Sequence, residues 1–261
     1  MKVSIIGCGN LGGSFTEGLL KAGVFKPNEI IVSDIDEKKI EDIGELGVQT
    51  TTDNREAVEK SDAIFLAVKP DTVVNVLDEL KLSEEKLLIS LAAGVSTDFL
   101  QEHANARIIR VMPNICAGTA EMASAYTTAE NNTEEDEEFV ENLLNQMGHT
   151  IKVNEDLMDA VTGLSGSGPA YVLLVIDALK EAGEDLGISE DKALELAAQT
   201  VKGAGGWILS SGESIEKLID RVCSPKGTTI EGIKVLETEK LKESLKKAVR
   251  SAAERSKELS K

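Results

Sequence analysis

Short apolar segments alternate with helical patterns along the first part of the chain. The segments are continuously apolar, which is typical of strands buried on both faces of a sheet. Between them, apolar residues recur at helical spacing, as in Leu11, Phe15 and Leu19. Strands that alternate with helices imply parallel strands with helical crossovers. We therefore expect an open, mostly parallel α/β sheet, with strands at residues 2–6, 29–32, 48–50, 63–68, 87–91, 108–112 and 151–153, and one more within 117–127.

The pattern changes after about residue 155. Residues 168–186 form a long, strongly apolar helical pattern, and further helical patterns follow at 189–207, 214–222, 229–237 and 239–259. A strand-rich part followed by a helical part suggests two domains, which we place at residues 1–155 and 156–261. The last helix carries Leu241, Leu245, Val249 and Ala252 on one stripe, which predicts burial against a partner or against its own domain.

A glycine-rich turn joins the first strand to the first helix. Its residues Gly7, Cys8, Gly9, Asn10, Leu11 and Gly12 match G-x-G-x-x-G in the strand–turn–helix context that a dinucleotide-binding motif requires. The glycines permit a tight turn, close approach of a pyrophosphate and close packing of the helix on the strand. The helix N-terminus offers free N–H groups to phosphates. We therefore predict a Rossmann domain in which these six residues bind the cofactor.

Asp34, at the end of the second strand, is the residue expected to meet the adenosine ribose. It lies 22 residues after Gly12, close to the expected spacing of about 20. A carboxylate accepts hydrogen bonds from ribose hydroxyls and repels the 2′-phosphate of NADP(H), so it favours NADH. Lys38 and Lys39 lie one turn further on and offer a compensating charge, which leaves NADPH open. Ser33 is a further candidate contact to the ribose or phosphate.

Composition argues against nucleic acid and membranes as binding partners. The net charge is −18, from 28 Lys and Arg against 46 Asp and Glu, which argues against broad contact with nucleic acid or an anionic membrane. The longest unbroken apolar run has seven residues, at 170–176, whereas a membrane-spanning helix needs about 20. Three cysteines without a C-x-x-C pair favour a reducing cytoplasm and no metal site. The N-terminal residues enter a strand directly and show no secretory signal peptide.

Five later segments narrow the function. Three of them end predicted strands: Ala-Val-Lys-Pro at 67–70, Ser-Leu-Ala-Ala-Gly-Val at 90–95 and Arg-Val-Met-Pro-Asn at 110–114. The other two are Leu-Ser-Gly-Ser-Gly-Pro-Ala-Tyr at 164–171 and Ser-Pro-Lys-Gly-Thr-Thr at 224–229. In this order and spacing the set resembles the pyrroline-5-carboxylate reductase family, nearly from end to end. The last two segments carry most of the resemblance.

The resemblance implies a function and an assembly. Members of that family reduce the cyclic imine 1-pyrroline-5-carboxylate to L-proline with NAD(P)H, the last step of proline synthesis. The implied architecture is a Rossmann domain followed by a helical domain that interlocks with another subunit. The implied oligomer is a homodimer, often assembled further into a decamer. We expect a cytoplasmic enzyme whose partners are this substrate and its own copies, with no nucleic acid and no membrane.

The strand ends and the turn at 224–229 supply the remaining candidate contacts. Ligands of open α/β sheets bind beyond the carboxyl ends of the strands. Asn54 follows the third strand and suits either the cofactor or an N-cap. The turn at 224–229 precedes a helix, so its N–H groups and hydroxyls suit a substrate carboxylate. Besides the glycine-rich turn, the predicted cofactor contacts are Ser33, Asp34, Asn54, Ala67, Val68, Lys69, Pro70, Ala93 and Gly94, and the predicted substrate contacts are Asn114, Ser224, Gly227, Thr228 and Thr229.

Thr229 is the catalytic candidate, because the resemblance implies a hydrogen bond from it to the ring nitrogen; the same hydroxyl also suits a helix cap. Hydride transfer to an imine needs alignment of the reacting carbon more than a base, so we expect no catalytic histidine. The sequence departs from the family pattern at Lys226, where glycine is usual, at Gly163 in place of alanine, and at Ile115-Cys116 in place of Thr-Pro.

Three alternatives stay open. A β-hydroxy-acid dehydrogenase also pairs a Rossmann domain with a helical one, and it needs an acid–base lysine, for which Lys180 and Lys202 are candidates by position. A non-catalytic dinucleotide sensor would bind the cofactor without turnover. An imine reductase for a six-membered ring differs in pocket packing that sequence motifs do not specify.

Overall fold

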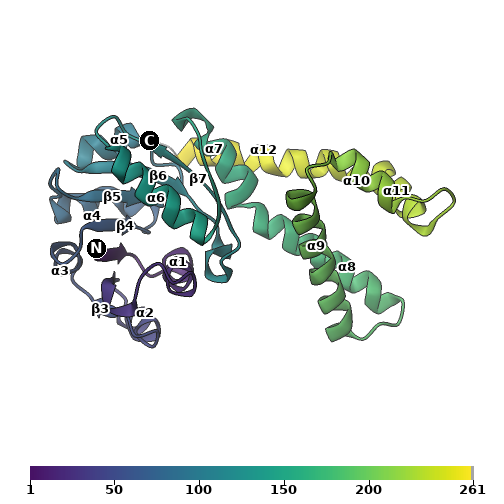
Figure 1. The fold of residues 1–261 in the computed structure, drawn as a ribbon, viewed down its shortest axis with the longest axis horizontal. Helices are drawn as coiled ribbons and strands as arrows, with labels where there is room; N and C mark the ends of the chain where they lie inside the picture. The colour runs from purple at the N-terminus through teal and green to yellow at the C-terminus, as the bar shows by residue number, and fades with distance from the viewer. Residues whose placement is uncertain (260–261) are drawn as a thin grey trace. The chain divides into compact units, whose positions relative to one another are not determined.

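The computed structural model describes residues 1–259 and divides into two compact units. Among the described residues, the first unit comprises Met1–Ser167 and residues 250–259, and the second comprises Gly168–Val249 (Figure 1). The domains expected at 1–155 and 156–261 differ from these units at both ends of the helical part. Residues 156–167 and the end of the last helix pack with the sheet-containing unit. Residues 260–261 of the expected second domain lie outside the described residues.

An eight-stranded sheet forms the centre of the first unit, in the order β3-β2-β1-β4-β5-β6-β7-β8. The first six strands run parallel, β7 is antiparallel to β6, and β8 is parallel to β7. The predicted open, mostly parallel α/β sheet is therefore confirmed. The strands are β1 (Val3–Ile6), β2 (Ile30–Ser33), β3 (Gln49–Thr51), β4 (Ala63–Leu66), β5 (Leu87–Ser90), β6 (Arg107–Met112), β7 (Met122–Thr128) and β8 (Gly148–Lys152).

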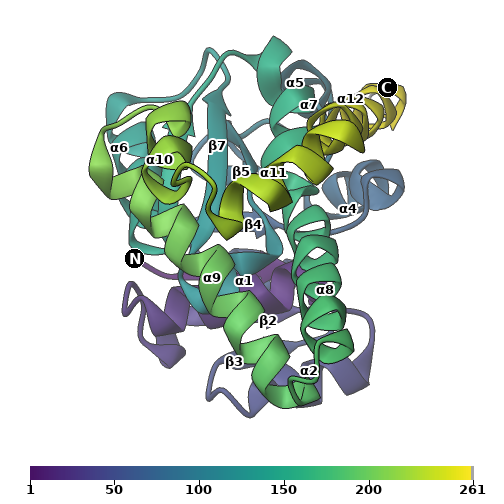
Figure 2. The ribbon, with the colours of Figure 1, turned by 90° about the vertical axis from the view of Figure 1, so that its right-hand side faces the viewer.

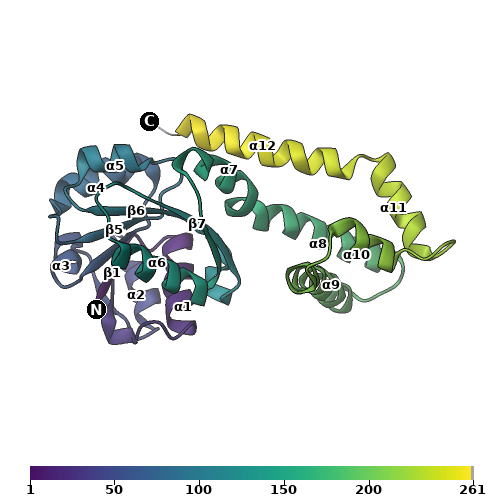
Figure 3. The ribbon, with the colours of Figure 1, turned by 45° about the horizontal axis from the view of Figure 1, so that its top comes forward.

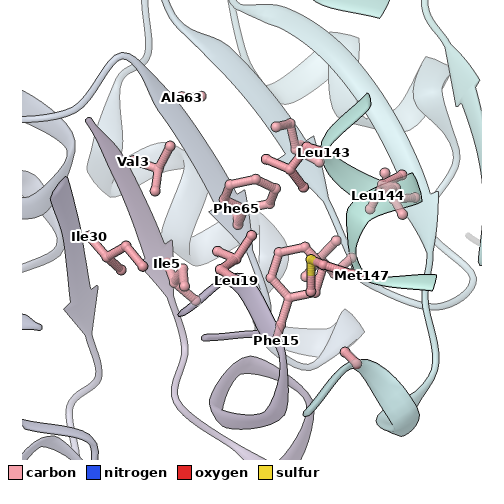
Figure 4. Close-up of a cluster of buried hydrophobic side chains, with 14 of the residues drawn as sticks. Val3, Ile5, Phe15, Leu19, Ile30, Ala63, Phe65, Leu143, Leu144 and Met147 are labelled. Atoms are coloured by element: carbon pink, nitrogen blue, oxygen red, sulfur yellow. The ribbon is translucent and has the colours of Figure 1, made fainter. Parts of the chain in front are cut away.

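Helices cover both faces of this sheet. On one face, α1 (Asn10–Lys21), α2 (Glu37–Gly44) and α6 (Glu134–Gln146) pack on the alternate strand residues that point towards them. Phe15 of α1 meets Phe65 of β4 with ring centroids 5.0 Å apart, at the centre of the cluster in Figure 4. On the other face lie α3 (Asn54–Glu59), α4 (Val73–Leu80) and α5 (Thr97–His103). Burial on both faces explains why the strand segments are continuously apolar.

The second unit is entirely helical. It contains α8 (Gly168–Asp185), α9 (Glu190–Ser211), α10 (Ile215–Val222), α11 (Thr228–Thr238) and the start of α12 (Leu241–Leu259). The helices α8 and α9 lie side by side (Figure 2). Large apolar side chains stay exposed on this unit, including Leu173 at 62%, Leu174 at 70% and Leu209 at 83%. Apolar surface on this scale marks an interaction surface.

The helical stretch Glu155–Asp185 has the length and mean hydropathy of a membrane-crossing helix. Only 11% of its most apolar window is buried within the chain. It also contains a π-helical turn at Thr162–Gly166. An apolar helix at a subunit interface has the same composition.

The chain leaves the first unit through a segment of short turns, and the end of α12 returns beside it. This segment contains Glu155–Leu157, α7 (Met158–Val161) and the π-helical turn. Ser256 of α12 is 3% exposed, and its Oγ donates a hydrogen bond to Asp159 Oδ1 at 2.7 Å. Figure 3 shows this end of α12 beside α7. On the predicted α12 stripe, Leu241 and Leu245 are still 37% and 38% exposed in the single chain.

Candidate active site

The glycine-rich turn has the geometry that its sequence predicts. A Cβ on Gly12 would lie 2.0 Å from the carbonyl oxygen of Gly7, and Gly7 itself has φ +100° with a Cβ position 2.8 Å from Ala67 O. Close packing of α1 on the strands therefore requires both glycines. A Cβ on Gly9 would meet nothing within 4 Å, so this residue faces open space. Gly9 thus leaves room for a ligand rather than for packing.

The N-terminus of α1 can hold an anion. Its N-cap is Gly9, no side chain caps the helix, and its first turn has no acidic residue. The N–H groups of this turn are therefore not satisfied by side chains, and the helix dipole favours negative charge there. A pyrophosphate fits both the open space and the donor set, so the structure is compatible with the cofactor that the motif implies.

Asp34 is fixed beside this turn. Its Oδ2 accepts the Cys8 N–H at 2.6 Å and its Oδ1 accepts the Asp36 N–H at 3.0 Å. The Cys8 N–H is therefore committed to Asp34 and not directed at a phosphate. Lys39 Nζ lies 3.9 Å from Asp34 Oδ2, which makes Lys39 the nearer of the two candidate lysines to pair with the carboxylate. Burial and the Asp34 charge raise the pKa of Cys8 to about 11, so its thiol stays protonated at neutral pH and is a poor nucleophile.

Ser33, the last residue of β2, and Asn54, the first residue of α3, are hydrogen-bonded to each other. Both are buried, and Ser33 Oγ donates to Asn54 Oδ1 at 2.8 Å. The alternative N-cap role for Asn54 is wrong, because Asp53 caps α3 by accepting the N–H groups of Arg55 and Glu56. Asn54 also approaches the Glu79 carboxylate at 3.5 Å.

The loops after β4 and β5 bring the remaining cofactor candidates to the carboxyl edge of the sheet. Ala67 and Val68 are half-buried and Lys69 is exposed, while Pro70 starts a short 3₁₀ helix. Ala93 is half-buried. Gly94 has φ +72°, and a Cβ there would lie 3.0 Å from Ser256 O. These residues and the glycine-rich turn follow neighbouring parallel strands, as ligand sites of open α/β sheets do.

We expected the side-chain amide of Asn114 to meet the substrate. In the structure, it hydrogen-bonds to the backbone of two other residues of the same polypeptide. Asn114 is 6% exposed. Its Nδ2 donates to Ser165 O at 3.1 Å, and its Oδ1 accepts the Cys116 N–H at 3.1 Å. A Cβ on Gly166 would lie 2.6 Å from Met112 Cε, so the end of β6 packs closely on the turn at 162–166.

The turn at 224–229 presents the N-terminus of α11. Gly227 is its N-cap without a side-chain cap, and the Gly227 N–H donates to Ser224 O at 2.9 Å. A Cβ on Gly227 would lie 2.3 Å from Ser224 Oγ and 3.0 Å from Ser224 O, so a larger residue there would require the Ser224 side chain to turn away. Lys226, the departure from the family pattern, has φ +63°, a conformation that favours glycine. Thr228 begins α11 one residue earlier than expected.

Thr229 faces an apolar cavity within the helical unit. The cavity has a volume of about 480 Å³, and its lining includes Trp207, Ile208, Cys223 and Ile233. Within residues 1–259, the Thr229 hydroxyl has no hydrogen-bond partner. A hydroxyl at the rim of an apolar cavity beside a helix N-terminus can orient a small ring that carries a carboxylate.

The structure argues against Lys180 as the acid–base lysine of the dehydrogenase alternative. Lys180 Nζ lies 3.7 Å from Glu184 and 3.6 Å from Glu190, and these charges raise the pKa of Lys180, Glu184 most strongly. An acid–base lysine needs a lowered pKa. Within residues 1–259, no group of His, Cys, Asp and Glu side chains could hold a metal ion.

Three polar residues near the start of α5, Arg110, Glu155 and Thr97, were not among the predicted site residues. Arg110 of β6 pairs with Glu155, and Glu155 contacts Thr97 at the start of α5. An arginine inside an otherwise apolar strand was the available sequence signal, because a buried guanidinium needs an anionic partner.

Comparison with known proteins identifies the family. Residues 155–259 match the model described as pyrroline-5-carboxylate reductase dimerisation, and residues 2–94 match NADP oxidoreductase, coenzyme F420-dependent. A pyrroline-5-carboxylate reductase of Methanosarcina acetivorans is 43% identical over 100% of this chain and 98% of its own. The chain belongs to the pyrroline-5-carboxylate reductase family. The resemblance carried by the five segments is therefore confirmed.

Other members of the pyrroline-5-carboxylate reductase family agree along the whole chain. The Arabidopsis thaliana enzyme is 41% identical over 99% of this chain and 95% of its own. A structure from Coxiella burnetii is 38% identical, covers 100% of this chain and 98% of its own, and has a TM-score of 0.89. A structure from Plasmodium falciparum with NADP bound is 30% identical, with the same coverage and a TM-score of 0.91. The exposed apolar surface of the helical unit lies in the dimerisation region, which supports self-association.

Proposed function

We propose that the chain transfers a hydride from NAD(P)H to the C=N carbon of 1-pyrroline-5-carboxylate and releases L-proline. The observation that carries this proposal is the full-length match to reductases of that name. The glycine-rich turn and the uncapped α11 N-terminus supply the two binding surfaces that the reaction needs. When bound, the dinucleotide supplies the hydride.

The cofactor half of the site is assigned to the first unit. The free N–H groups of the first turn of α1 bind the pyrophosphate, and Gly9 leaves it room. Asp34, oriented by the Cys8 and Asp36 N–H groups, accepts the hydroxyls of the adenosine ribose. This carboxylate favours NADH, and Lys39 tempers the repulsion of a 2′-phosphate. The loops at 67–70 and 93–94 complete the cofactor contacts.

The substrate half is assigned to the second unit. The N–H groups at the start of α11 and the hydroxyls of Ser224 and Thr228 hold the carboxylate. The Thr229 hydroxyl hydrogen-bonds to the ring nitrogen and fixes the ring at the rim of the apolar cavity. A protonated imine becomes a neutral amine when hydride adds to its carbon, so the chemical step needs no base. Alignment then accounts for most of the rate.

The assembly follows from the same assignment. The proposed unit is a homodimer formed through the helical unit, with further association into a decamer, in the cytoplasm. Light scattering in buffer without detergent tests it. A detergent-free dimer or larger oligomer supports self-association, whereas recovery of the protein only with membranes would contradict it.

The decisive experiment is oxidation of NADH and NADPH with 1-pyrroline-5-carboxylate, with the six-membered cyclic imine in parallel. Turnover with a kcat/KM that favours NADH supports both the reaction and the role of Asp34. Thr229→Val should lower kcat about 10- to 100-fold, because one hydrogen bond to a charged group contributes about 1.5–3 kcal/mol. Thr229→Ser keeps the hydroxyl and is the matched control. Folded protein that binds dinucleotide but reduces neither imine would overturn the proposal and favour the sensor alternative.

A further inference from the structure

An ion pair between a buried arginine and a half-buried glutamate lies beside the loop that carries Ala93 and Gly94. Arg110 is 3% exposed, and its Nη1 is paired with Oε1 of Glu155. Within residues 1–259, the Arg110 Nη2 is buried and has no hydrogen-bond partner. The charge of Arg110 therefore depends on Glu155 for its compensation, since a buried charge without a partner is strongly unfavourable.

The second carboxylate oxygen of Glu155 reaches the other end of the loop. Glu155 Oε2 accepts a hydrogen bond from Thr97 Oγ1 at 3.0 Å and faces the Thr97 N–H at 3.4 Å. Thr97 is the first residue of α5 and is 5% exposed. A carboxylate at this position also interacts favourably with the helix dipole. Arg110 thus fixes the start of α5 through Glu155.

The same loop is held on its other side by the end of α12. Gly94 packs so closely on this helix that a Cβ would lie 3.0 Å from Ser256 O and 3.2 Å from Leu259 Cβ. Ser256 is in turn bonded to Asp159, on the segment that contains Glu155. The loop from Ala92 to Thr97 is therefore held at two points. Thr97 bonds to Glu155, and Gly94 packs on Ser256, which bonds to Asp159 on the same short segment.

We propose that Arg110 is a positioning residue for the dinucleotide. It does not need to touch the cofactor: through Glu155 it holds the loop from Ala92 to Thr97 in the conformation that binds it. This inference rests on the proposed function, which places Ala93 and Gly94 at the dinucleotide. Without the ion pair, binding must order the loop, and the cost of that ordering lowers the affinity for NAD(P)H.

The test measures cofactor affinity and turnover separately. Thr97→Val removes the hydroxyl that meets Glu155 and leaves Arg110 paired, so it is the mildest variant. Glu155→Gln removes the charge that pairs with Arg110. We expect the Kd for NADH, from fluorescence titration, to rise about five- to tenfold in both variants. With saturating cofactor, kcat should stay within about twofold of the wild-type value, because bound cofactor returns the loop to its ordered conformation.

A matched control lies at the opposite end of the same strand. Arg107 Nε is 2.9 Å from Asp136 Oδ2, so β6 begins with another arginine–carboxylate pair. Arg107→Met should lower thermal stability and leave the Kd for NADH unchanged. Arg110→Met removes the charge opposite Glu155 and should lower the affinity for NADH. Arg110→Lys keeps a charge there and should retain part of that affinity.

The outcomes separate the inference from the function on which it rests. Wild-type Kd in Thr97→Val and Glu155→Gln, or an equal rise in Arg107→Met, would overturn the positioning role. Gly94→Ala tests the site itself, because its Cβ would push the loop away from α12. If Gly94→Ala bound NADH with wild-type affinity, the assignment of Gly94 to the cofactor would fail, whatever the Arg110 variants showed.

Discussion

Lys226→Gly should stabilise the protein. Lys226 has φ +63°, and the left-handed region costs a residue with a Cβ about 1–2 kcal/mol. Glycine avoids this cost but loses about 0.5–1 kcal/mol more conformational freedom on folding. The difference is a gain of about 0–1.5 kcal/mol, centred on about 0.75 kcal/mol. For a chain of this size, 1 kcal/mol corresponds to a Tm shift of roughly 2–4 °C.

Two other lysines provide matched tests of that calculation. Lys81 and Lys240 have φ of 48° and 56°, so their glycine variants should gain as much. Lys246→Gly, within α12, should instead lose about 1 kcal/mol. Urea unfolding at one fixed protomer concentration measures all four, because self-association shifts apparent stability. Destabilisation by Lys226→Gly, with gains at the other two positions, would refute the reasoning and show that the Lys226 side chain makes a favourable interaction.

The remaining predictions concern the cofactor, the core and a thiol. Asp34→Asn should raise kcat/KM with NADPH relative to NADH by about tenfold, because a carboxylate about 5 Å from a phosphate costs roughly 1–3 kcal/mol; an unchanged ratio would contradict the role of Asp34. Phe65→Ala, at a fully buried position, should cost about 3–5 kcal/mol of unfolding free energy, and a loss below about 1 kcal/mol would mean that the core repacks. Because the pKa of Cys8 is raised to about 11, its alkylation, followed by peptide mass spectrometry, should keep accelerating from pH 9 to pH 11; a plateau at pH 9 would exclude the raised pKa.

Local patterns predict the parallel part of the sheet and the helices well. The buried strands are continuous apolar runs because helices cover both faces, and the glycine-rich turn is short enough for sequence spacing to define it. The start of β8 depends on a contact instead. A Cβ on Gly148 would lie 2.0 Å from Met122 O, and no local pattern reveals that approach.

The contacts that support the candidate site are long-range, and periodicity does not encode them. Asn114 meets Ser165, and Ser256 meets Asp159, across wide sequence separations. The hydrophobic stripe of α12 predicts one buried face, but it does not indicate that the end of the helix belongs to the other unit. The leucines of α8 are exposed in the single chain, so their apolar pattern does not reflect a core within this chain.

The return of the last helix makes the helical unit an insertion within the sheet-containing unit, between Ser167 and Arg250. Proteolysis at one peptide bond in the helical unit would therefore not release a complete sheet-containing unit. It would give two fragments that each keep part of this unit, held together non-covalently by contacts such as Ser256 with Asp159. In genetic terms, the helical unit can be exchanged only by replacing the interior of the gene. A single-chain version of the sheet-containing unit alone requires residue 167 to be joined to residue 250, either directly or through a linker.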